Sequence, residues 1–253
     1  MMVDWRLGKL QFFTILFITL LGFGFAQEEK TVIYLIGDST CADKNPEAFP
    51  EMGWGTPFKT FFNASVHIEN RAKNGRSTKS FLEEGRWDDV LSTLKKDDYV
   101  FIQFGHNDEV KSKVGRYTTP EEFKTNLKKY VKDSQEKKAN PILLTPVSRR
   151  SFENGELTDT HQQYAQLVRE VAQEEQVPLI DMTRKSMDLL EKWGVQKSEL
   201  LFHHLSPGEH PNYPNGRKDN THFNELGARK MAQLVLQGVR ELKIPLEDQI
   251  LKR

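Results

Sequence analysis

The stretch TVIYLIGDST, residues 31–40, joins a short apolar run to a tight polar turn that contains Gly37 and Ser39. Such a run, rich in β-branched and aromatic side chains, is typical of a strand buried on both faces of a parallel sheet. Similar runs recur farther along the chain, at residues 66–69, 99–104, 142–145 and 177–180. We therefore expect a mainly five-stranded parallel sheet.

Amphipathic helices are predicted between these runs. The clearest pattern begins at Thr119, with Pro120 at the first helical position and Glu122 completing a capping box. Two later patterns, over residues 164–172 and 226–239, also place apolar side chains at helical spacing. Strands that alternate with helices predict a doubly wound, three-layer α/β/α fold of the flavodoxin-like type.

The composition is that of an ordinary globular protein. The chain has 253 residues, and its 36 Lys and Arg side chains are balanced by 36 Asp and Glu. This balance argues against a nucleic-acid-binding protein, which usually carries a basic excess. Cys41 is the only cysteine, so an intramolecular disulfide is excluded, and we expect a small buried side chain there.

The first 26 residues have the pattern of a secretory signal peptide. Arg6 and Lys9 precede an apolar run over residues 12–25, which ends in small residues where a signal peptidase would cleave. We expect residues 1–26 to be removed and one domain to span residues 27–253, in a secreted or periplasmic protein without membrane contact. The alternative is an uncleaved membrane anchor, for which the apolar run is short.

Chemically useful side chains follow the predicted strands and precede the last predicted helix. In an open parallel sheet, ligands bind at the carboxyl ends of the strands, so these segments should converge at one edge. A serine hydroxyl is a weak nucleophile that needs a base, and Ser39 and His222 supply such a pair. Asp219, three residues before His222, can orient the imidazole and stabilise its charged form. These three residues are the predicted catalytic triad.

An oxyanion hole can be assembled at the same edge. Acyl transfer needs preorganised hydrogen-bond donors around the developing negative charge. The predicted donors are the backbone N–H groups of Ser39 and Gly75 and the side-chain amide of Asn107. Gly75 suits this role because a residue without a Cβ lets substrate approach the backbone closely. The alternative roles are a helix N-cap for Ser39 and ordinary turn positions for Gly75 and Asn107.

These segments resemble the four sequence blocks of the SGNH (GDSL-like) hydrolases. Ser39 stands in GDST, Gly75 in NGRST and Asn107 in GHND. Asp219 and His222 stand in DNTH, in the order and spacing of that family. The GxSxG signature of the α/β-hydrolases is absent. The resemblance implies a serine esterase that acts through an acyl-enzyme, with the triad and oxyanion roles given above and without a cofactor.

Within that class the chain most resembles the rhamnogalacturonan acetylesterases. The strings that carry this resemblance are GDSTCAD from residue 37, MGWG from 52, QFGHND from 103, TPVSRR from 145 and PNYPNGRKDNTHF from 211. The resemblance implies removal of acetyl groups from a polysaccharide or oligosaccharide of pectin, which contains galacturonate.

Four residues are candidates for substrate binding. Trp54 could stack on a sugar ring, His106 lies beside Asn107, and Arg149 with Arg150 could pair with substrate carboxylates. Simpler structural roles are open for all four. Trp54 could pack in the core, His106 could support its loop, and the two arginines could be solvated surface charges.

A histidine-rich segment invites comparison with a zinc site. His203, His204, Glu209 and His210 lie within residues 203–220, which we expect to form a long loop beside the site. The H-E-x-x-H pattern is absent and no cysteine cluster accompanies the histidines, so we predict no metal.

Other functions are compatible with the same residues. An SGNH esterase could act on acetyl-xylan, on another carbohydrate ester or on a lysophospholipid. A non-catalytic carbohydrate-binding protein could share the fold, although it would have no need for Ser, His and Asp at these positions. The sequence leaves the oligomeric state open.

Overall fold

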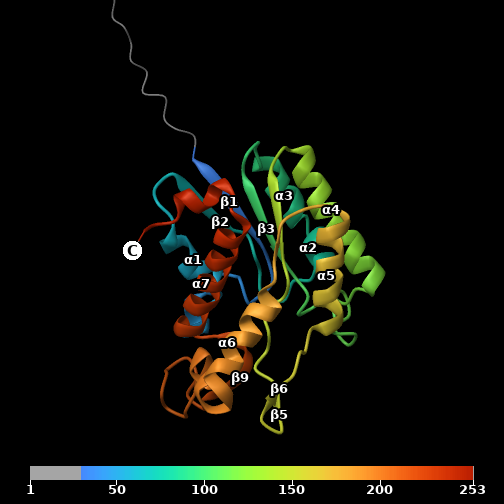
Figure 1. The fold of residues 1–253 in the computed structure, drawn as a ribbon. Helices are drawn as coiled ribbons and strands as arrows, with labels where there is room; N and C mark the ends of the chain where they lie inside the picture. Colours follow the sequence, from blue (N-terminus) through green and yellow to red (C-terminus); the bar gives the residue numbers. More distant parts are fainter. Residues whose placement is uncertain (1–29, 253) are drawn as a thin grey trace, which may run out of the picture.

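A parallel five-stranded sheet forms the centre of the computed structural model, which describes residues 30–252 (Figure 1). Its strands are β1 (Thr31–Gly37), β2 (Val66–Asn70), β3 (Tyr99–Gln103), β4 (Asn140–Leu144) and β7 (Leu179–Ile180). They lie in the order β2-β1-β3-β4-β7, and every neighbouring pair is parallel. This is the flavodoxin-like order, in which the direction of winding reverses between β1 and β3. The predicted fold class is confirmed.

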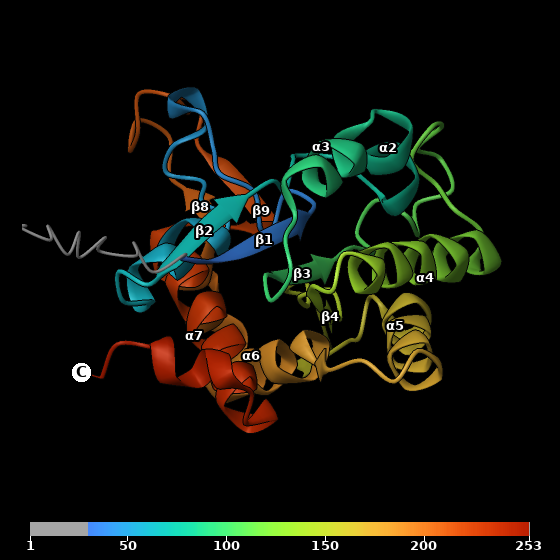
Figure 2. The ribbon, with the colours of Figure 1, turned by 90° about the horizontal axis from the view of Figure 1, so that it is seen from above.

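Helices cover both faces of the sheet (Figure 2). One layer contains α1 (Gly55–Phe58), α6 (Met182–Lys197) and α7 (Glu225–Leu242). The other layer contains α2 (Thr78–Glu83), α3 (Arg86–Thr93), α4 (Pro120–Glu136) and α5 (Gln162–Glu174). Short 3₁₀ segments complete the connections, at Pro46–Ala48, Lys59–Phe61, Ser198–Leu201 and Pro245–Gln249.

The alternation of side chains along β1 explains why the sheet needs two helical layers. Ile33 and Leu35 are buried in the core beneath α1, α6 and α7. Tyr34 and Ile36 are buried in the opposite core, beneath α2 to α5. Successive side chains of a strand point to opposite faces, so a strand that is apolar at every position is stable only when both faces are covered.

The helix that begins at residue 120 starts as its sequence predicts. The Thr119 hydroxyl accepts a hydrogen bond from the backbone N–H of Glu122, and the Glu122 carboxylate accepts one from the backbone N–H of Thr119. Asn224 caps α7 in the same way, by accepting a hydrogen bond from Gly227. Side-chain caps of this kind satisfy backbone donors that have no partner inside the helix.

The segment predicted as a long loop is instead a two-stranded hairpin. Strand β8 (Phe202–Leu205) pairs antiparallel with β9 (Arg217–Phe223), leaving residues 206–216 as the connection. A second hairpin, of β5 (Phe152–Glu153) and β6 (Glu156–Leu157), was not predicted either. Both hairpins lie at the end of the molecule where β1 to β4 finish (Figure 1). Their strands are short and largely polar, so the apolar patterns used for the central sheet do not detect them.

The predicted signal peptide, residues 1–26, lies outside the described residues. None of the helices within residues 30–252 is long and apolar enough to cross a membrane.

Candidate active site

An open cavity of about 560 Å³ lies at the carboxyl end of the sheet, beside the switch point between β1 and β3. Its lining includes six of the residues predicted from sequence to act in the site, namely Ser39, Gly75, His106, Asn107, Arg149 and His222. Ser39 follows β1, Gly75 follows β2 and Asn107 follows β3, whereas His222 belongs to β9. Segments distant in the sequence therefore meet at the edge where an open α/β sheet binds ligands.

Ser39, His222 and Asp219 form a continuous chain of polar contacts. His222 Nε2 lies 2.9 Å from the Ser39 hydroxyl oxygen. His222 Nδ1 lies 2.9 Å from Asp219 Oδ2, on the other side of the ring. These distances allow a hydrogen bond at each ring nitrogen, which is the arrangement a serine nucleophile needs for a histidine base.

A bulge in β9 brings Asp219 and His222 together. Phe223 pairs with Phe202, but the next residue of β8, His203, pairs with Asp219. Residues 220–222 therefore have no paired residue in the backbone ladder between β8 and β9. In a regular strand, residues three apart point to opposite faces, and the extra residues of a bulge remove that constraint. The other carboxylate oxygen of Asp219 accepts hydrogen bonds from the backbone N–H groups of Thr221 and His222, which hold the bulge.

The surroundings of Asp219 favour its charged form. Burial by itself would raise the pKa of this carboxyl group. Hydrogen bonds from the His222 ring and from the backbone N–H groups of His222 and Thr221 outweigh burial and hold the pKa well below its usual value. An aspartate that stays ionised can stabilise an imidazolium at His222 as it forms.

The residues of the predicted oxyanion donors line the same cavity as the Ser39 side chain. Gly75 has a φ of 77°, a left-handed conformation that any other residue adopts only with strain. Within the described residues, the backbone N–H groups of Ser39 and Gly75 donate no hydrogen bond to another protein atom. Asn107 Nδ2 donates to the Arg76 carbonyl oxygen at 3.0 Å, and because an amide nitrogen carries two hydrogens, one donor is left over. Each of the three predicted donors therefore has an N–H group without a protein acceptor.

Trp54 does not line the cavity, so the expectation that it stacks on a sugar ring is wrong. Its side chain is buried, and its indole N–H donates to Gln103 Oε1 at 2.7 Å. The flanking residues Gly53 and Gly55 explain this position, since a Cβ on either would meet the backbone carbonyl oxygens of Cys41 or Ala42. The MGWG segment therefore packs tightly beneath the Ser39 turn.

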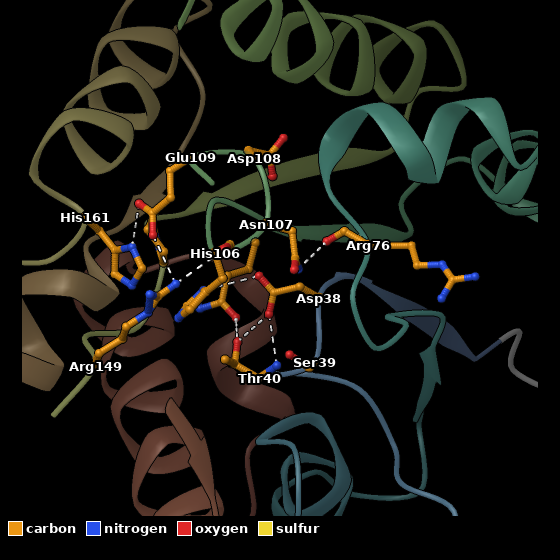
Figure 3. Close-up of polar contacts among 12 residues, drawn as sticks. Asp38, Ser39, Thr40, Arg76, His106, Asn107, Asp108, Glu109, Arg149 and His161 are labelled. Carbon is orange, nitrogen blue, oxygen red and sulfur yellow. Dashed lines mark hydrogen bonds and ion pairs between the residues drawn. The ribbon is translucent and has the colours of Figure 1, made fainter. Parts of the chain in front are cut away.

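His106 borders the cavity but is almost fully buried in a polar network (Figure 3). Its Nδ1 lies 3.3 Å from Asp38 Oδ2, and its ring packs edge-on against the ring of His161 at 4.3 Å. Burial is the largest effect on His106 and lowers its pKa to about 4, although the neighbouring Asp38 carboxylate acts in the opposite direction. A neutral, buried ring of this kind supports the loops that carry Ser39 and Asn107, which is the simpler of the two roles considered for it.

The same network continues to Arg149. His161 Nδ1 lies 2.9 Å from Glu109 Oε2, and Arg149 donates to Glu109 Oε1 at 3.0 Å and to the His106 carbonyl oxygen at 3.3 Å. Arg149 also lines the cavity, so it is within reach of a ligand, but its charge is partly neutralised by Glu109.

Arg150 does not line the cavity, so the expectation that it binds substrate is wrong. Its guanidinium donates to Glu199, Ser198 and Asn220, and its backbone N–H donates to the Asn220 carbonyl oxygen. Since Asn220 belongs to the bulge of β9, Arg150 supports the strand that carries His222. The side chain is 9% exposed, which leaves little of it free for a ligand.

Three cationic residues of the site were not predicted from the sequence. Lys113 and Arg116 line the cavity from the loop between β3 and α4, and Lys44 lies beside Ser39. The loop contains Lys111, Lys113 and Arg116, and nothing in its sequence indicates which of them face the cavity. Within the described residues, neither Lys113 nor Arg116 pairs with a carboxylate, so the cavity carries positive charge beside Ser39.

The histidines of the hairpin β8–β9 each have a different neighbour. The ring of His203 packs against Tyr213, His204 Nε2 lies 2.8 Å from Asn220 Oδ1, and His210 Nδ1 accepts a hydrogen bond from the backbone of Asn212. Residues 30–252 contain no group of three or more side chains placed to hold a metal ion.

Comparison with known proteins places this geometry in a family. Residues 35–230 match the GDSL-like lipase/acylhydrolase family. The chain is 41% identical over 222 residues to the rhamnogalacturonan acetylesterase RhgT of Bacillus subtilis strain 168, covering 87% of this chain and 94% of RhgT. It is 38% identical over 221 residues to the probable rhamnogalacturonan acetylesterase YesY of the same strain, covering 87% of this chain and 97% of YesY.

A solved structure has the same fold. The crystal structure of YxiM from Bacillus subtilis superimposes with a TM-score of 0.73 at 24% identity, covering 85% of this chain and 58% of that one. The family match spans all four segments that meet at the cavity. This chain belongs to the GDSL-like lipase/acylhydrolase family.

Proposed function

We propose that this protein is a serine esterase that removes O-acetyl groups from rhamnogalacturonan through a Ser39–His222–Asp219 mechanism. The observation that carries the proposal is the unbroken contact from the Ser39 hydroxyl through His222 to Asp219, at 2.9 Å on each side of the ring. A binding protein gains nothing from a serine hydroxyl aimed at an imidazole that a half-buried carboxylate orients.

The proposed reaction is acyl transfer in two steps. Ser39 attacks the acetyl carbonyl carbon while His222 Nε2 takes the hydroxyl proton. The oxyanion accepts hydrogen bonds from the N–H groups of Ser39 and Gly75 and from the Asn107 amide. His222 then gives its proton to the departing sugar oxygen, which leaves acetyl-Ser39. Water, deprotonated by His222, hydrolyses this ester and releases acetate.

The charge of the cavity favours an acidic polysaccharide as the substrate. Lys113 and Arg116 line the cavity without a carboxylate partner in the described residues, and Arg149 lines it beside Glu109. The backbone of rhamnogalacturonan contains galacturonate, whose carboxylates would pair with these cations. The relatives RhgT and YesY, which bear the name of this activity, support the same substrate.

The test measures acetate release from acetylated rhamnogalacturonan and from acetyl-xylan, a neutral polymer. The wild-type protein should release acetate faster from rhamnogalacturonan, and Ser39→Ala should release none while keeping the wild-type thermal unfolding midpoint. Equal wild-type rates on both polymers would leave a general carbohydrate esterase. Full activity in Ser39→Ala would refute the mechanism.

We further propose that the protein is exported. The proposal rests on residues 1–26, whose positive start, apolar run and small terminal residues are typical of a signal peptide. Expression of the full chain followed by N-terminal sequencing of the exported protein should give a sequence that starts near Gln27. A membrane-bound product that retains Met1 would indicate an uncleaved anchor instead.

A further inference from the structure

We infer that Lys113 is a positioning residue of the oxyanion hole, which fixes and polarises the Asn107 amide. The inference rests on the proposed esterase function. The Lys113 ammonium donates a hydrogen bond to Asn107 Oδ1 at 2.9 Å, while Asn107 Nδ2 donates to the Arg76 carbonyl oxygen at 3.0 Å. The family blocks do not suggest the Lys113 contact, because Lys113 lies in the loop that follows the GHND segment.

The two contacts together select one orientation of the amide. If the amide were flipped, its N–H groups would face an ammonium and its oxygen would face the carbonyl oxygen of Arg76. Both arrangements are repulsive, since an ammonium has no acceptor and a carbonyl no donor. With the observed orientation, one N–H of Nδ2 is held by Arg76 (Figure 3) and the second is available to an oxyanion. The Arg76 carbonyl oxygen holds Nδ2 of Asn107, and the Lys113 ammonium holds Oδ1 of the same amide.

The loop that carries Lys113 is anchored at both ends. The backbone N–H of Thr118 donates to the carbonyl oxygen of Asp108 at 3.0 Å, and Asp108 is the residue directly after Asn107. Inside the loop, the N–H of Lys113 donates to the Val110 carbonyl oxygen, and the Lys113 carbonyl oxygen accepts from Arg116 and Tyr117. These turns place Val110, Lys113 and Arg116 at a spacing of three residues along the cavity wall. The backbone at Lys113 is therefore fixed by hydrogen bonds, and it holds the ammonium group beside Asn107.

The charge of Lys113 strengthens the amide as a donor. A cation at the amide oxygen draws electron density from the nitrogen, which makes its N–H groups more acidic and their hydrogen bonds to an oxyanion stronger. Lys113 need not touch the substrate for this effect.

The first experiment compares Lys113→Met with Lys111→Met, an exposed lysine of the same loop that does not line the cavity. The substrate is p-nitrophenyl acetate, which has no carboxylate, so loss of substrate pairing does not enter. Lys113→Met should lower kcat about tenfold with little change in KM, which is less than the loss of roughly a hundred- to a thousandfold expected when an oxyanion donor is deleted. Lys111→Met should keep the wild-type kcat.

The second experiment is a double-mutant cycle with Asn107→Ala. If Lys113 acts through the amide, Lys113→Met should cost nothing further in the Asn107→Ala background, because the group it orients is already absent. Lys113→Arg, which keeps a charged donor, should recover part of the lost kcat. The thermal unfolding midpoint of each variant separates a loss of fold from a loss of donor strength.

The outcomes distinguish this inference from the proposed function. A wild-type kcat in Lys113→Met, or losses that multiply in the double variant, would overturn the role of Lys113 while Ser39→Ala remained inactive. Activity that survives in Ser39→Ala would instead overturn the esterase mechanism itself. If Lys113→Met lowers kcat about tenfold without changing KM, and has no effect in the Asn107→Ala background, Lys113 is established as a positioning residue of the oxyanion hole.

Discussion

The Lys44 ammonium lies 2.6 Å from the backbone carbonyl oxygen of Ser39 and is almost completely buried. It also donates to Asn74 Oδ1 at 2.8 Å and pairs with Glu51 Oε1 at 2.7 Å, so all three of its donors are used. Lys44 thus joins the turn of the nucleophile to the residue before Gly75. The two backbone donors of the proposed oxyanion hole, at Ser39 and Gly75, are held relative to each other by one side chain.

Lys44→Met should therefore impair both stability and catalysis. The variant leaves Glu51 buried without its cation, and breaking a buried ion pair in this way typically costs about 3–5 kcal/mol of unfolding free energy. A shift of the donors relative to Ser39 should lower kcat by up to about a hundredfold. Denaturant unfolding and steady-state kinetics with p-nitrophenyl acetate measure the two effects.

A second substitution separates those effects. Glu51→Gln added to Lys44→Met removes the unpaired carboxylate and should restore part of the stability. The kcat should stay low, because the bridge between Ser39 and Asn74 is still missing. Recovery of wild-type kcat in this double variant would mean that Lys44 serves only to neutralise Glu51.

Asn107→Ala should act on turnover rather than on substrate binding. Loss of one oxyanion donor typically costs about a hundred- to a thousandfold in kcat. KM should change little, since the donor is most effective when the oxyanion forms. A normal kcat with a raised KM would show that Asn107 contacts the bound substrate and not the oxyanion.

Arg116→Gln should lower kcat/KM on acetylated rhamnogalacturonan and spare p-nitrophenyl acetate. Arg116 lines the cavity and is exposed, and a carboxylate–guanidinium pair at such a site contributes about 1 kcal/mol or less. The expected loss is therefore a few-fold, and it should shrink at high salt because exposed charges are screened.

Arg150→Gln is the matched control for that experiment. This arginine faces Glu199 and Asn220 and does not line the cavity, so its replacement should lower the thermal unfolding midpoint without changing the ratio of the two substrates' rates. A selective loss on the acidic polymer in Arg150→Gln, with none in Arg116→Gln, would contradict the observed arrangement of the two side chains.

His106 should make the protein less stable at acid pH. Burial lowers the pKa of His106 to about 4, from an ordinary value of 6.5, so the unfolded chain binds a proton over this range and the folded protein does not. The stabilising effect is complete above pH 6.5 and is lost as pH falls from 6.5 to about 4. For a pKa shift of this size, the unfolding free energy decreases by at most roughly 3 kcal/mol.

Comparison with His106→Gln isolates this contribution. Asp108 has the opposite effect. Burial raises the pKa of its carboxyl group from 3.8 to about 7, so the folded protein becomes less stable as pH rises from 3.8 towards 7. Both proteins contain Asp108, so the difference between their unfolding free energies should depend on His106. The difference in unfolding free energy between the wild-type protein and His106→Gln should become smaller as pH falls from 6.5 to about 4. A difference that stays constant over this range would show that His106 does not titrate there.

Local patterns in the sequence were sufficient for the sheet and for most of the site. Each predicted strand formed within about two residues of its predicted ends, because short runs that are apolar at every position are typical of strands buried on both faces of a parallel sheet. The topology then forces the ends of β1, β2 and β3 to one edge, so Ser39, Gly75 and Asn107 meet without further information.

The polar parts of the site did not follow from local pattern. Asp219 and His222 were expected in a loop before a helix, yet they meet because β9 bulges against β8. Trp54 and Arg150 looked suited to bind sugar and carboxylate, but one donates to Gln103 in the core and the other to Glu199. The partner that decides each case lies far away in the sequence.

The sequence by itself determined the fold class, the capped helix at Thr119 and the chemistry available to Ser39 and His222. The tertiary structure decided which cations face the cavity, and it placed Lys44 against Ser39 and Lys113 against Asn107. The physical reason is range. Periodicity and capping depend on neighbours within a few residues, whereas a long polar side chain takes its position from whichever acceptors the folded chain brings within hydrogen-bond distance.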